Sequence, residues 1–596
     1  MFRILYFMFR NLVGMKTSLG ICLFFIFFSF NIVCGQQVDT IFRRPLDIPV
    51  LLSATFAELR PNHLHSGIDY RTQGTSGHKV YACEQGYVSR VSVSPVGYGN
   101  ALYITHPNGY TTVYGHLDAF NDEITTYVKQ QQYEQERFAV NLFPDKTLLP
   151  VKRGDVVAFS GNTGGSSGPH LHFEVRDTRT EWVLNPLQFG FGVKDNVAPV
   201  MRRLAVYPIG EGSTVNGSTN KLILDLEKSG KTYRIAGNKK LTIVGKAAFG
   251  IDTYDQTSGS ANRCGPYSIR FWIDSSMMFS QTVDSFSFDE TRYINSLIDY
   301  EYYHHHQVRF NRMYIEPNNR LSIYDRHIDR GIVSFPDSAN HQALVIVRDF
   351  HGNNSRLNFM FEYVPGTVAT QAPFPAQMPG ADIISGILDD ISKKEFVHRQ
   401  QGIRVVIPED ALYDEIDFAY AVTGKLKGLY SKTYKIHDPG TPLHKAVTIE
   451  IAADSLPVRL REKALMVQIE PSGRRSSVGG EYSNGIVSAH SRVFGDFAIG
   501  VDTVPPRITP INIKNGANMR GVKNIRFTTK DDFSGISSYN GWIDGQWALF
   551  EYDAKNNLLY YNFDADRLTK NTQHTLELKI TDGKGNTAEY KATFNW

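Results

Sequence analysis

Short runs in which apolar and polar residues alternate recur along the chain and predict a mainly β protein. Leu576, Leu578 and Ile580 alternate with polar residues, which is the period-two pattern of a strand with one buried face. Gly, Pro, Asn or Asp bound many of these runs. The predicted strands include Lys79–Cys83, Gly86–Val93, Ala101–His106, Thr111–Leu117, Asp155–Phe159, Arg404–Pro408 and Ala446–Ile451. Residues 125–138 instead have a helix-forming composition.

Two later parts of the chain repeat each other. The matching segments occur in the same order, and the interval from His to Asp in the last pair is the same in both copies. The pairs are 195–199 with 502–506, 255–259 with 531–535, 272–274 with 542–544, and 341–353 with 574–586. We interpret them as two copies of one immunoglobulin-like β-sandwich, the first with an insertion between Ser275 and Asp337.

Changes in pattern divide the chain into several domains, as expected for 596 residues. A stretch rich in Pro, Ala, Thr and Gln separates the first sandwich from another β-rich unit and predicts a linker. The predicted units are a signal peptide (1–35), an N-terminal domain (36–194), a β-sandwich with an insertion (195–364), a linker (365–379), a β-rich domain (380–501) and a second β-sandwich (502–596).

The N-terminus carries an export signal. Arg10 and Lys16 precede the apolar run Leu19–Val33, which is short for a membrane span and typical of a secretory signal. The small-residue pattern before Gln36 makes that residue the predicted mature start, with Met15 as an alternative initiator. Cys34 raises a lipoprotein form as a less favoured alternative. We therefore expect a periplasmic or cell-envelope protein with no membrane span in the mature chain.

Composition narrows the function classes. The net charge of +3 on so long a chain argues against a nucleic-acid partner. After cleavage only Cys83 and Cys264 remain, in different predicted domains, so we expect neither a structural disulfide nor a zinc–thiolate cluster.

Candidate chemistry gathers in the N-terminal domain. A glycine-rich segment, 161–168, leads into His170-Leu171-His172, and a strand places both histidines on one face. His65 and Asp69 lie four apart around a glycine, and His116 lies in a strand-like segment. A catalytic zinc needs about three His, Asp or Glu ligands and one open position. Histidines also suit proton transfer and oxyanion stabilisation near neutral pH.

These motifs resemble those of the lysostaphin-type, LytM-like zinc endopeptidases, which cut peptide bonds in peptidoglycan. The resemblance covers roughly residues 50–190. It implies that His65, Asp69 and His172 bind Zn²⁺, and that His116 and His170 are catalytic, with either as the base. The fold class it implies is mainly β: a small antiparallel-sheet LytM-like catalytic domain with a groove, followed by immunoglobulin-like β-sandwich modules.

Two departures from that family add expectations. Only 29 residues of the predicted mature chain, 36–64, precede His65, so we expect no inhibitory pro-domain of the family's kind. The segment 121–149 is longer than a minimal enzyme needs and could narrow or cover the groove.

Several other features favour ordinary structural explanations. His63 is expected beside the site rather than among the ligands. The run His304-His305-His306 is expected in an exposed strand or loop. The turns at 531–532 and 582–585 lack the regular oxygen ligands of a calcium loop, so turn chemistry is preferred.

The sequence therefore predicts an exported zinc metalloendopeptidase acting on peptidoglycan cross-links or stem peptides. The C-terminal β domains would hold it in the envelope or bind a protein partner there. Two rivals stay open: a non-hydrolytic LytM-like protein that recruits or activates another wall hydrolase, and a zinc peptidase acting on a secreted protein.

Overall fold

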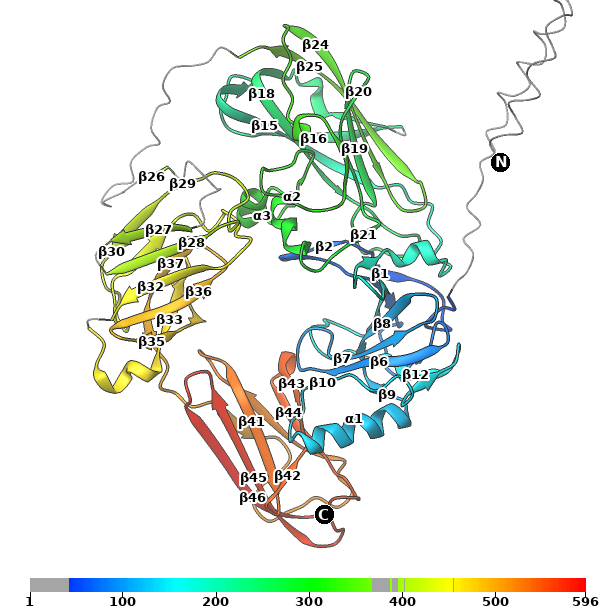
Figure 1. The fold of residues 1–596 in the computed structure, drawn as a ribbon, viewed down its shortest axis with the longest axis vertical. Coiled ribbons are helices and arrows are strands. Elements are labelled where there is room, and N and C mark those ends of the chain that lie inside the picture. Colours follow the sequence, from blue (N-terminus) through cyan, green and yellow to red (C-terminus); the bar gives the residue numbers. More distant parts are fainter. Residues whose placement is uncertain (1–41, 231, 367–385, 388–394, 401, 454) are drawn as a thin grey trace, which may run out of the picture.

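The computed structural model describes residues 42–230, 232–366, 386–387, 395–400, 402–453 and 455–596. The predicted signal peptide and most of the predicted linker lie outside these residues. The chain is mainly β, as the alternating pattern predicts, and successive β-rich units follow one another around a ring (Figure 1). Among the described residues, no helix has the length and apolar character that a membrane crossing requires.

An antiparallel sheet forms the centre of the N-terminal domain, with strand order β1-β4-β13-β8-β7-β6-β10. Its strands are β1 (Leu52–Ala54), β4 (Ile68–Arg71), β13 (His170–Asp177), β8 (Tyr110–Leu117), β7 (Asn100–Thr105), β6 (Gly86–Val93) and β10 (Val140–Leu142). Smaller elements complete the domain: the hairpin β2 (Leu59–Arg60) and β3 (His63–Leu64), the sheet β5 (Lys79–Tyr81), β12 (Val156–Phe159) and β9 (Ala119–Phe120), and the edge strands β11 (Pro150–Val151) and β14 (Val183–Leu184).

Strand β13 shows why this sheet positions a site. Leu171, Phe173 and Val175 are completely buried in the core on one face. His172 and Glu174 alternate with them and therefore point to the other face. Loss of the apolar face would remove the packing that fixes the opposite, polar face.

The predicted helix is α1 (Asp122–Glu134), which begins three residues before the predicted start and ends four before the predicted end. The side chain of Asn121 accepts a hydrogen bond from the backbone N–H of Ile124 and so caps the first turn. Asp122 and Glu123 in that turn complement the positive end of the helix.

The repeated segments form matching structures. The first copy lies in a ten-stranded sheet: β22 (Asn311–Arg312), β18 (Thr242–Tyr254), β15 (Val200–Val215), β16 (Leu222–Ser229), β17 (Thr232–Ile235), β25 (Asn354–Val364), β24 (Ala339–Arg348), β19 (Ser268–Ile273), β20 (Ser276–Thr282) and β23 (Tyr324–His327). The second copy packs a four-stranded sheet, β38 (Arg507–Pro510), β40 (Asn524–Lys530), β44 (Leu558–Asn562) and β43 (Phe550–Asp553), with a five-stranded sheet, β39 (Ala517–Asn518), β46 (Thr587–Asn595), β45 (Gln573–Asp582), β41 (Ile536–Ile543) and β42 (Gln546–Ala548).

Equivalent side chains make equivalent contacts in the two copies. His341 Nδ1 lies 2.9 Å from Asp274 Oδ2, and His574 Nδ1 lies 2.7 Å from Asp544 Oδ2. The repeat is therefore structural as well as sequential. The immunoglobulin-like topology and the predicted domain boundaries stay predictions.

Between the two copies, the described residues from 395 to 501 form two five-stranded sheets around one core. One contains β27 (Glu395–Gln400), β28 (Ile403–Pro408), β32 (Val447–Ala452), β36 (Ile486–Ser491) and β35 (Glu481–Ser483). The other contains β30 (Tyr420–Thr423), β31 (Thr433–Ile436), β37 (Gly495–Val501), β33 (Ala464–Ile469) and β34 (Arg475–Gly479).

The insertion in the first copy packs on the N-terminal domain. Its strand β21 (Ser285–Phe286) pairs with β14, and Phe286 is completely buried in the N-terminal core. The helices α2 (Ile294–Leu297) and α3 (Tyr300–His306) follow. The expectation of a strand or loop at His304–His306 is wrong, because the Asp299 side chain accepts from Tyr302 N–H and starts a helix there.

The second copy contacts the N-terminal domain through a different surface (Figure 1). Tyr133 of α1 packs edge-on against Trp547, with ring centroids 5.3 Å apart, and the Arg567 guanidinium lies over the Tyr133 ring. Lys129 forms an ion pair with Asp564 at 2.7 Å. The segment after Asn121 thus docks the last sandwich.

Candidate metal centre and catalytic histidines

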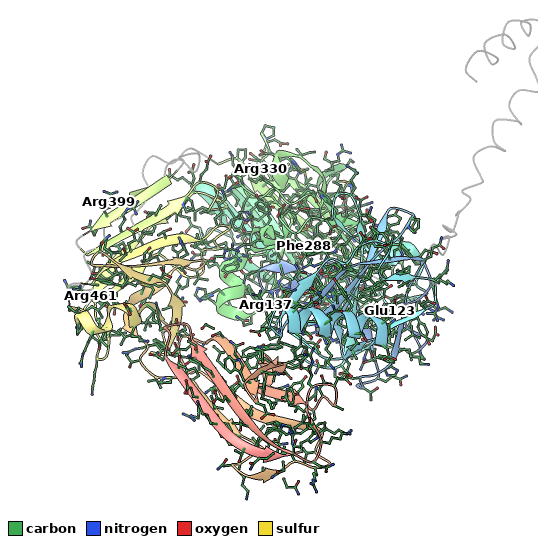
Figure 2. The ribbon with its side chains drawn as sticks, turned by 60° about the horizontal axis from the view of Figure 1, so that its bottom comes forward. Glu123, Arg137, Phe288, Arg330, Arg399 and Arg461 are labelled. Carbon is green, nitrogen blue, oxygen red and sulfur yellow. The ribbon has the colours of Figure 1, made fainter. Side chains whose placement is uncertain are left out.

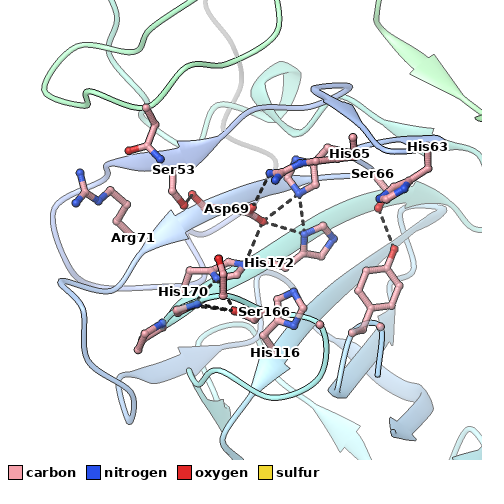
Figure 3. Close-up of a pocket in the computed structure, with 18 of the residues that line it drawn as sticks. Ser53, His63, His65, Ser66, Asp69, Arg71, His116, Ser166, His170 and His172 are labelled. Atoms are coloured by element: carbon pink, nitrogen blue, oxygen red, sulfur yellow. Dashed lines mark hydrogen bonds and ion pairs between the residues drawn. The ribbon is translucent and has the colours of Figure 1, made fainter. Parts of the chain in front are cut away.

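Three side chains that are distant in sequence meet at one point. Asp69 Oδ1 lies 3.0 Å from both His65 Nε2 and His172 Nδ1, and those two nitrogens lie 3.0 Å apart (Figure 3). Antiparallel pairing of β4 with β13 places Asp69 directly opposite His172. His65 follows β3 and completes the group.

The outer nitrogens of both imidazoles are held by acceptors. His65 Nδ1 lies 2.8 Å from the Thr55 carbonyl oxygen, and His172 Nε2 lies 2.9 Å from Glu174 Oε1. Carbonyl and carboxylate oxygens only accept, so each of these nitrogens carries the hydrogen. When the rings are neutral, His65 Nε2 and His172 Nδ1 both direct lone pairs at the Asp69 carboxylate.

This donor set fits a zinc ion. Three unprotonated donors repel one another unless a cation lies between them. Tetrahedral zinc with bonds of 2.0–2.1 Å separates its ligand atoms by about 3.3 Å, close to the distances seen here. Histidine ligands that donate their second N–H to a carboxylate or carbonyl are the usual outer arrangement of zinc sites.

Glu174 holds the His172 ring in place from within the core. It is completely buried and accepts hydrogen bonds from Ser66 Oγ and Tyr98 Oη, each at 2.5 Å, and from Arg176 Nε at 2.7 Å. Burial alone would raise the pKa of Glu174, but Arg176 and His172 hold it well below its ordinary value. Its charge therefore stays available to orient His172.

The carboxylates of Asp69 and Glu174 both change the pKa of His172. Burial opposes protonation of the ring, but hydrogen bonds to Asp69 and Glu174 raise the pKa of metal-free His172 to about 9. A cation must displace this proton to reach Nδ1.

His116 and His170 form a second pair beside the three. Their ring centroids are 4.7 Å apart, and both Nδ1 atoms lie 2.9 Å from backbone carbonyl oxygens, those of Thr163 and Gly168 respectively. Nε2 is therefore the unprotonated nitrogen of each neutral ring. His170 Nε2 lies 3.6 Å from Asp69 Oδ1.

Both of these histidines are disposed to remain neutral. Burial and the neighbouring His172 and His170 lower the pKa of His116 to about 3. Burial also lowers the pKa of His170. His116 has φ of 59°, an uncommon left-handed conformation for a non-glycine residue that is often found at functional sites.

A cavity of about 820 Å³ exposes the five predicted residues to one space. Its walls include Arg60, His63 and Phe288, the last contributed by the insertion of the first sandwich and lying toward the middle of the molecule (Figure 2). His63 lines the cavity but is outside the group of three. None of residues 121–149, all of which the structure describes, lines this cavity.

Sequence reasoning missed several residues of the site. Glu174 could have been predicted, because it lies four residues after His170 and two after His172 on the same face of the strand. Arg60, whose Nη2 lies 3.6 Å from Asp69 Oδ2, and Thr55 carried no comparable signal. Phe288 reaches the cavity only through the folding of a distant insertion.

Comparisons with known proteins match parts of the chain. Residues 63–133 match peptidase family M23, and residues 391–502 match a Zu5-like domain. A stretch of 114 residues is 39% identical to the DD-carboxypeptidase/endopeptidase Mpg of Neisseria meningitidis, covering 19% of this chain and 20% of that protein. The peptidoglycan DD-endopeptidase ShyB of Vibrio cholerae is 37% identical over 111 residues, or 19% and 20% of the two chains.

One of the similar proteins is named as an activator of a hydrolase and not as a peptidase. The murein hydrolase activator NlpD of Salmonella dublin is 31% identical over 125 residues, 21% of this chain and 26% of that one. The chain thus spans about a fifth to a quarter of these curated relatives. Hydrolase and activator names both occur among them.

Solved structures also match part of the chain. The catalytic domain of lysostaphin from Staphylococcus simulans is 22% identical, with a TM-score of 0.18, covering 24% of this chain and 91% of that one. A zinc-containing peptidase from Vibrio cholerae is 31% identical, with a TM-score of 0.17, covering 22% and 35%. Scores of this size do not establish a shared overall fold.

Proposed function

We propose that this chain, which carries a peptidase family M23 domain, is an exported zinc endopeptidase that hydrolyses peptide bonds in peptidoglycan. One observation carries the proposal: two histidine nitrogens and a carboxylate oxygen lie 3.0 Å from one another, and two histidines with lowered pKa values lie beside them in one open cavity. A purely structural cluster would not require this second pair of histidines facing a solvent-accessible space.

His65, Asp69 and His172 would hold the metal through Nε2, Oδ1 and Nδ1. Zinc bound there would polarise a carbonyl group and lower the pKa of a water molecule toward about 7. Glu174 and the Thr55 carbonyl keep the two imidazoles in the required tautomers. One carboxylate and two neutral rings would leave the metal with a net positive charge.

His116 and His170 would act directly on the reactants. Their anchored Nδ1–H groups leave Nε2 of each ring to accept a proton from the attacking water. The protonated ring can then donate a hydrogen bond to the developing oxyanion, or its proton to the leaving amine. The lowered pKa values of both rings keep them unprotonated, and so competent as bases, near neutral pH.

The substrate is proposed from chemistry and similarity together. The relatives that match this domain include proteins named as peptidoglycan DD-endopeptidases, and the predicted signal peptide would deliver the enzyme to the envelope. The cavity is bounded by Arg60 and Arg71, which suit the carboxylates of stem peptides. The C-terminal β domains would position the enzyme there or bind an envelope protein.

The test is hydrolysis of cross-linked sacculi by the mature chain, residues 36–596. We expect zinc-loaded protein to release peptide fragments, chelator to abolish the release, and His172→Ala to be inactive under both conditions. Casein serves as a second substrate, and cleavage of casein without cleavage of sacculi would assign a different substrate.

The activator is the second candidate, supported by the similarity to NlpD. Zinc-loaded protein that releases nothing from sacculi alone, but increases release by an added amidase, would support this candidate and contradict the endopeptidase. The five histidine and aspartate positions favour the endopeptidase, because an activator does not need the pair His116 and His170.

A further inference from the structure

A second group of possible metal ligands lies at the junction between the N-terminal domain and the first sandwich. Asp195, Asp349 and His351 offer ligand atoms that lie within 4.8 Å of one another. Asp255 lines the same small cavity, of about 20 Å³, together with Thr55 and Asn185 of the N-terminal domain. This space is enough for one water molecule or one ion.

Asp255 is the residue that the fold leaves unsatisfied. It is 3% exposed, and its Oδ1 has no hydrogen-bond partner. Thr257, 6% exposed, also faces the cavity with a hydroxyl oxygen that lacks a partner. Unpartnered buried oxygens are costly, and an unpartnered buried carboxylate most of all.

Burial and the carboxylates of Asp349 and Asp195 raise the pKa of Asp255 to about 7, although the backbone N–H of Gln256 acts in the opposite direction. Burial and Asp195 likewise raise the pKa of Asp349, against the effects of Asn353 and His351. Among the described residues, no lysine or arginine forms an ion pair with any of the three carboxylates.

The second sandwich provides an internal comparison, because Asp531 occupies the position equivalent to Asp255. Asp531 Oδ1 accepts hydrogen bonds from the backbone N–H groups of Phe533 at 3.0 Å and Gly535 at 2.7 Å. In the first sandwich the backbone of Asp255 instead pairs with that of Cys264 in an isolated antiparallel β-bridge, and Asp255 Oδ1 receives no such hydrogen bond. The Oδ1 atom of this aspartate is therefore bonded to the backbone in one copy and has no hydrogen-bond partner in the other.

We propose that Asp195, Asp255 and Asp349 bind a hard divalent cation, with Ca²⁺ as the ion of best fit, at the junction of the N-terminal domain and the first sandwich. Carboxylate and hydroxyl oxygens are the ligands that Ca²⁺ prefers, and the Thr257 hydroxyl and water molecules would complete its shell. The ion joins the two domains, because Thr55 and Asn185 line the same cavity.

This site adjoins the zinc group without sharing a ligand. The Thr55 carbonyl oxygen accepts the His65 Nδ1 hydrogen bond, while the Thr55 side chain borders the acidic cavity. The proposal does not depend on catalysis, since it concerns cation binding by three residues outside the peptidase cavity.

The test is calorimetric titration of Ca²⁺ into the zinc-loaded mature chain, with Mg²⁺ in parallel. We expect one calcium site with a dissociation constant of roughly 10⁻⁴–10⁻³ M, the range of extracellular calcium modules, and a Ca²⁺-dependent rise in unfolding temperature. Asp255→Asn should remove both effects while remaining folded, because it neutralises an unpaired buried charge. Asp531→Asn changes the equivalent position of the second sandwich, where Asp502, Asp531 and Asp582 also offer ligand atoms within 4.8 Å of one another. Because backbone N–H groups already bond to Asp531 Oδ1, this variant should keep the calcium response.

Two results would overturn the proposal. One is the absence of both a heat of Ca²⁺ binding and a rise in unfolding temperature at a Ca²⁺ concentration 5–10 times the upper limit of the expected dissociation constant. The other is an unchanged calcium response in Asp255→Asn. Preference for a second equivalent of Zn²⁺ over Ca²⁺, lost in His351→Ala, would also contradict a hard-cation site.

Discussion

The two histidine groups of the candidate site have different environments, which suit the two roles proposed for them. His172 contacts two carboxylates, which raise the pKa of the metal-free ring to about 9. His116 and His170 are anchored by backbone carbonyls, and burial lowers their pKa values. The first environment stabilises positive charge, whether of a proton or a metal. The second keeps a neutral ring that can exchange a proton with substrate.

The largest expected effect comes from removing one member of each group. His172→Ala should abolish detectable zinc binding and activity, because it deletes one of the three proposed ligands and removes one hydrogen-bond partner from each of Asp69 and Glu174. His116→Ala should keep stoichiometric zinc and lose about 10²–10⁴-fold in kcat, the range for a general acid–base residue. Zinc content by mass spectrometry, measured alongside sacculus hydrolysis, separates the two variants. Equal zinc loss in both would refute the division of roles.

A smaller effect is expected from substitution of Glu174, whose carboxylate contacts the proposed ligand His172. Glu174→Gln should weaken zinc affinity about 10–100-fold, because the charge that orients His172 is lost. Competition with a chromophoric chelator measures this affinity in the folded protein. Glu181→Gln is the matched control, since Glu181 also contacts Arg176 but is largely exposed. An unchanged affinity in Glu174→Gln would show that His172 is oriented by other groups.

The pH dependence of zinc binding sharpens the comparison further. Zinc binds the deprotonated His172 Nδ1, whose pKa in the metal-free protein is raised to about 9. Affinity should therefore increase with pH, up to about tenfold per unit below pH 9, and level off above it. In the absence of metal, protonation of His172 stabilises the fold fully below its ordinary pKa of 6.5, and this contribution is lost as pH rises through about 9.

Calorimetry in two buffers of different ionisation enthalpy tests this prediction, because it counts the protons released. About one proton per zinc is expected from His172 at pH 7. Zinc binding without proton release would show that the carboxylates do not protonate the metal-free ring.

The smallest predicted effect concerns only the catalytic pair. Lys555 of the last sandwich contacts the carbonyl oxygens of Asn162 and, at 3.0 Å, of Ser166, whose hydroxyl lies 3.1 Å from His170 Nδ1. Lys555→Ala should lower kcat by about 2–5-fold without changing zinc content, through looser positioning of His170. Lys570→Ala, which removes a contact with Trp596 inside that sandwich, is the control. Equal effects of the two variants would argue against a link through this loop.

Local pattern predicted much of the N-terminal domain. The alternation around Phe173 predicted the strand that the structure shows as β13. The predicted strand Gly86–Val93 has the same limits as β6. The pairing of β4 with β13, which sets Asp69 opposite His172, also depends on register between segments a hundred residues apart. The resemblance to a family implied that Asp69 and His172 bind the same metal ion, but neither it nor the residue pattern predicted this register.

Long-range contacts account for what could not be predicted. Phe286 enters the N-terminal core and Phe288 reaches the cavity from an insertion that belongs to another part of the chain. The histidine run at 304–306 forms a helix because Asp299 caps it, a local signal that the sequence analysis overlooked. Docking of α1 on the last sandwich depends on Tyr133 and Trp547, which no sequence spacing relates.

X-ray absorption at the zinc edge of the loaded protein tests the central claim most directly. The predicted spectrum has two imidazole nitrogens and one carboxylate oxygen at 2.0–2.2 Å, with a further light ligand in the open position, and it is the same in His116→Ala. A first shell with three or four imidazoles, or one that changes in His116→Ala, would contradict the proposed division between ligand and catalytic histidines.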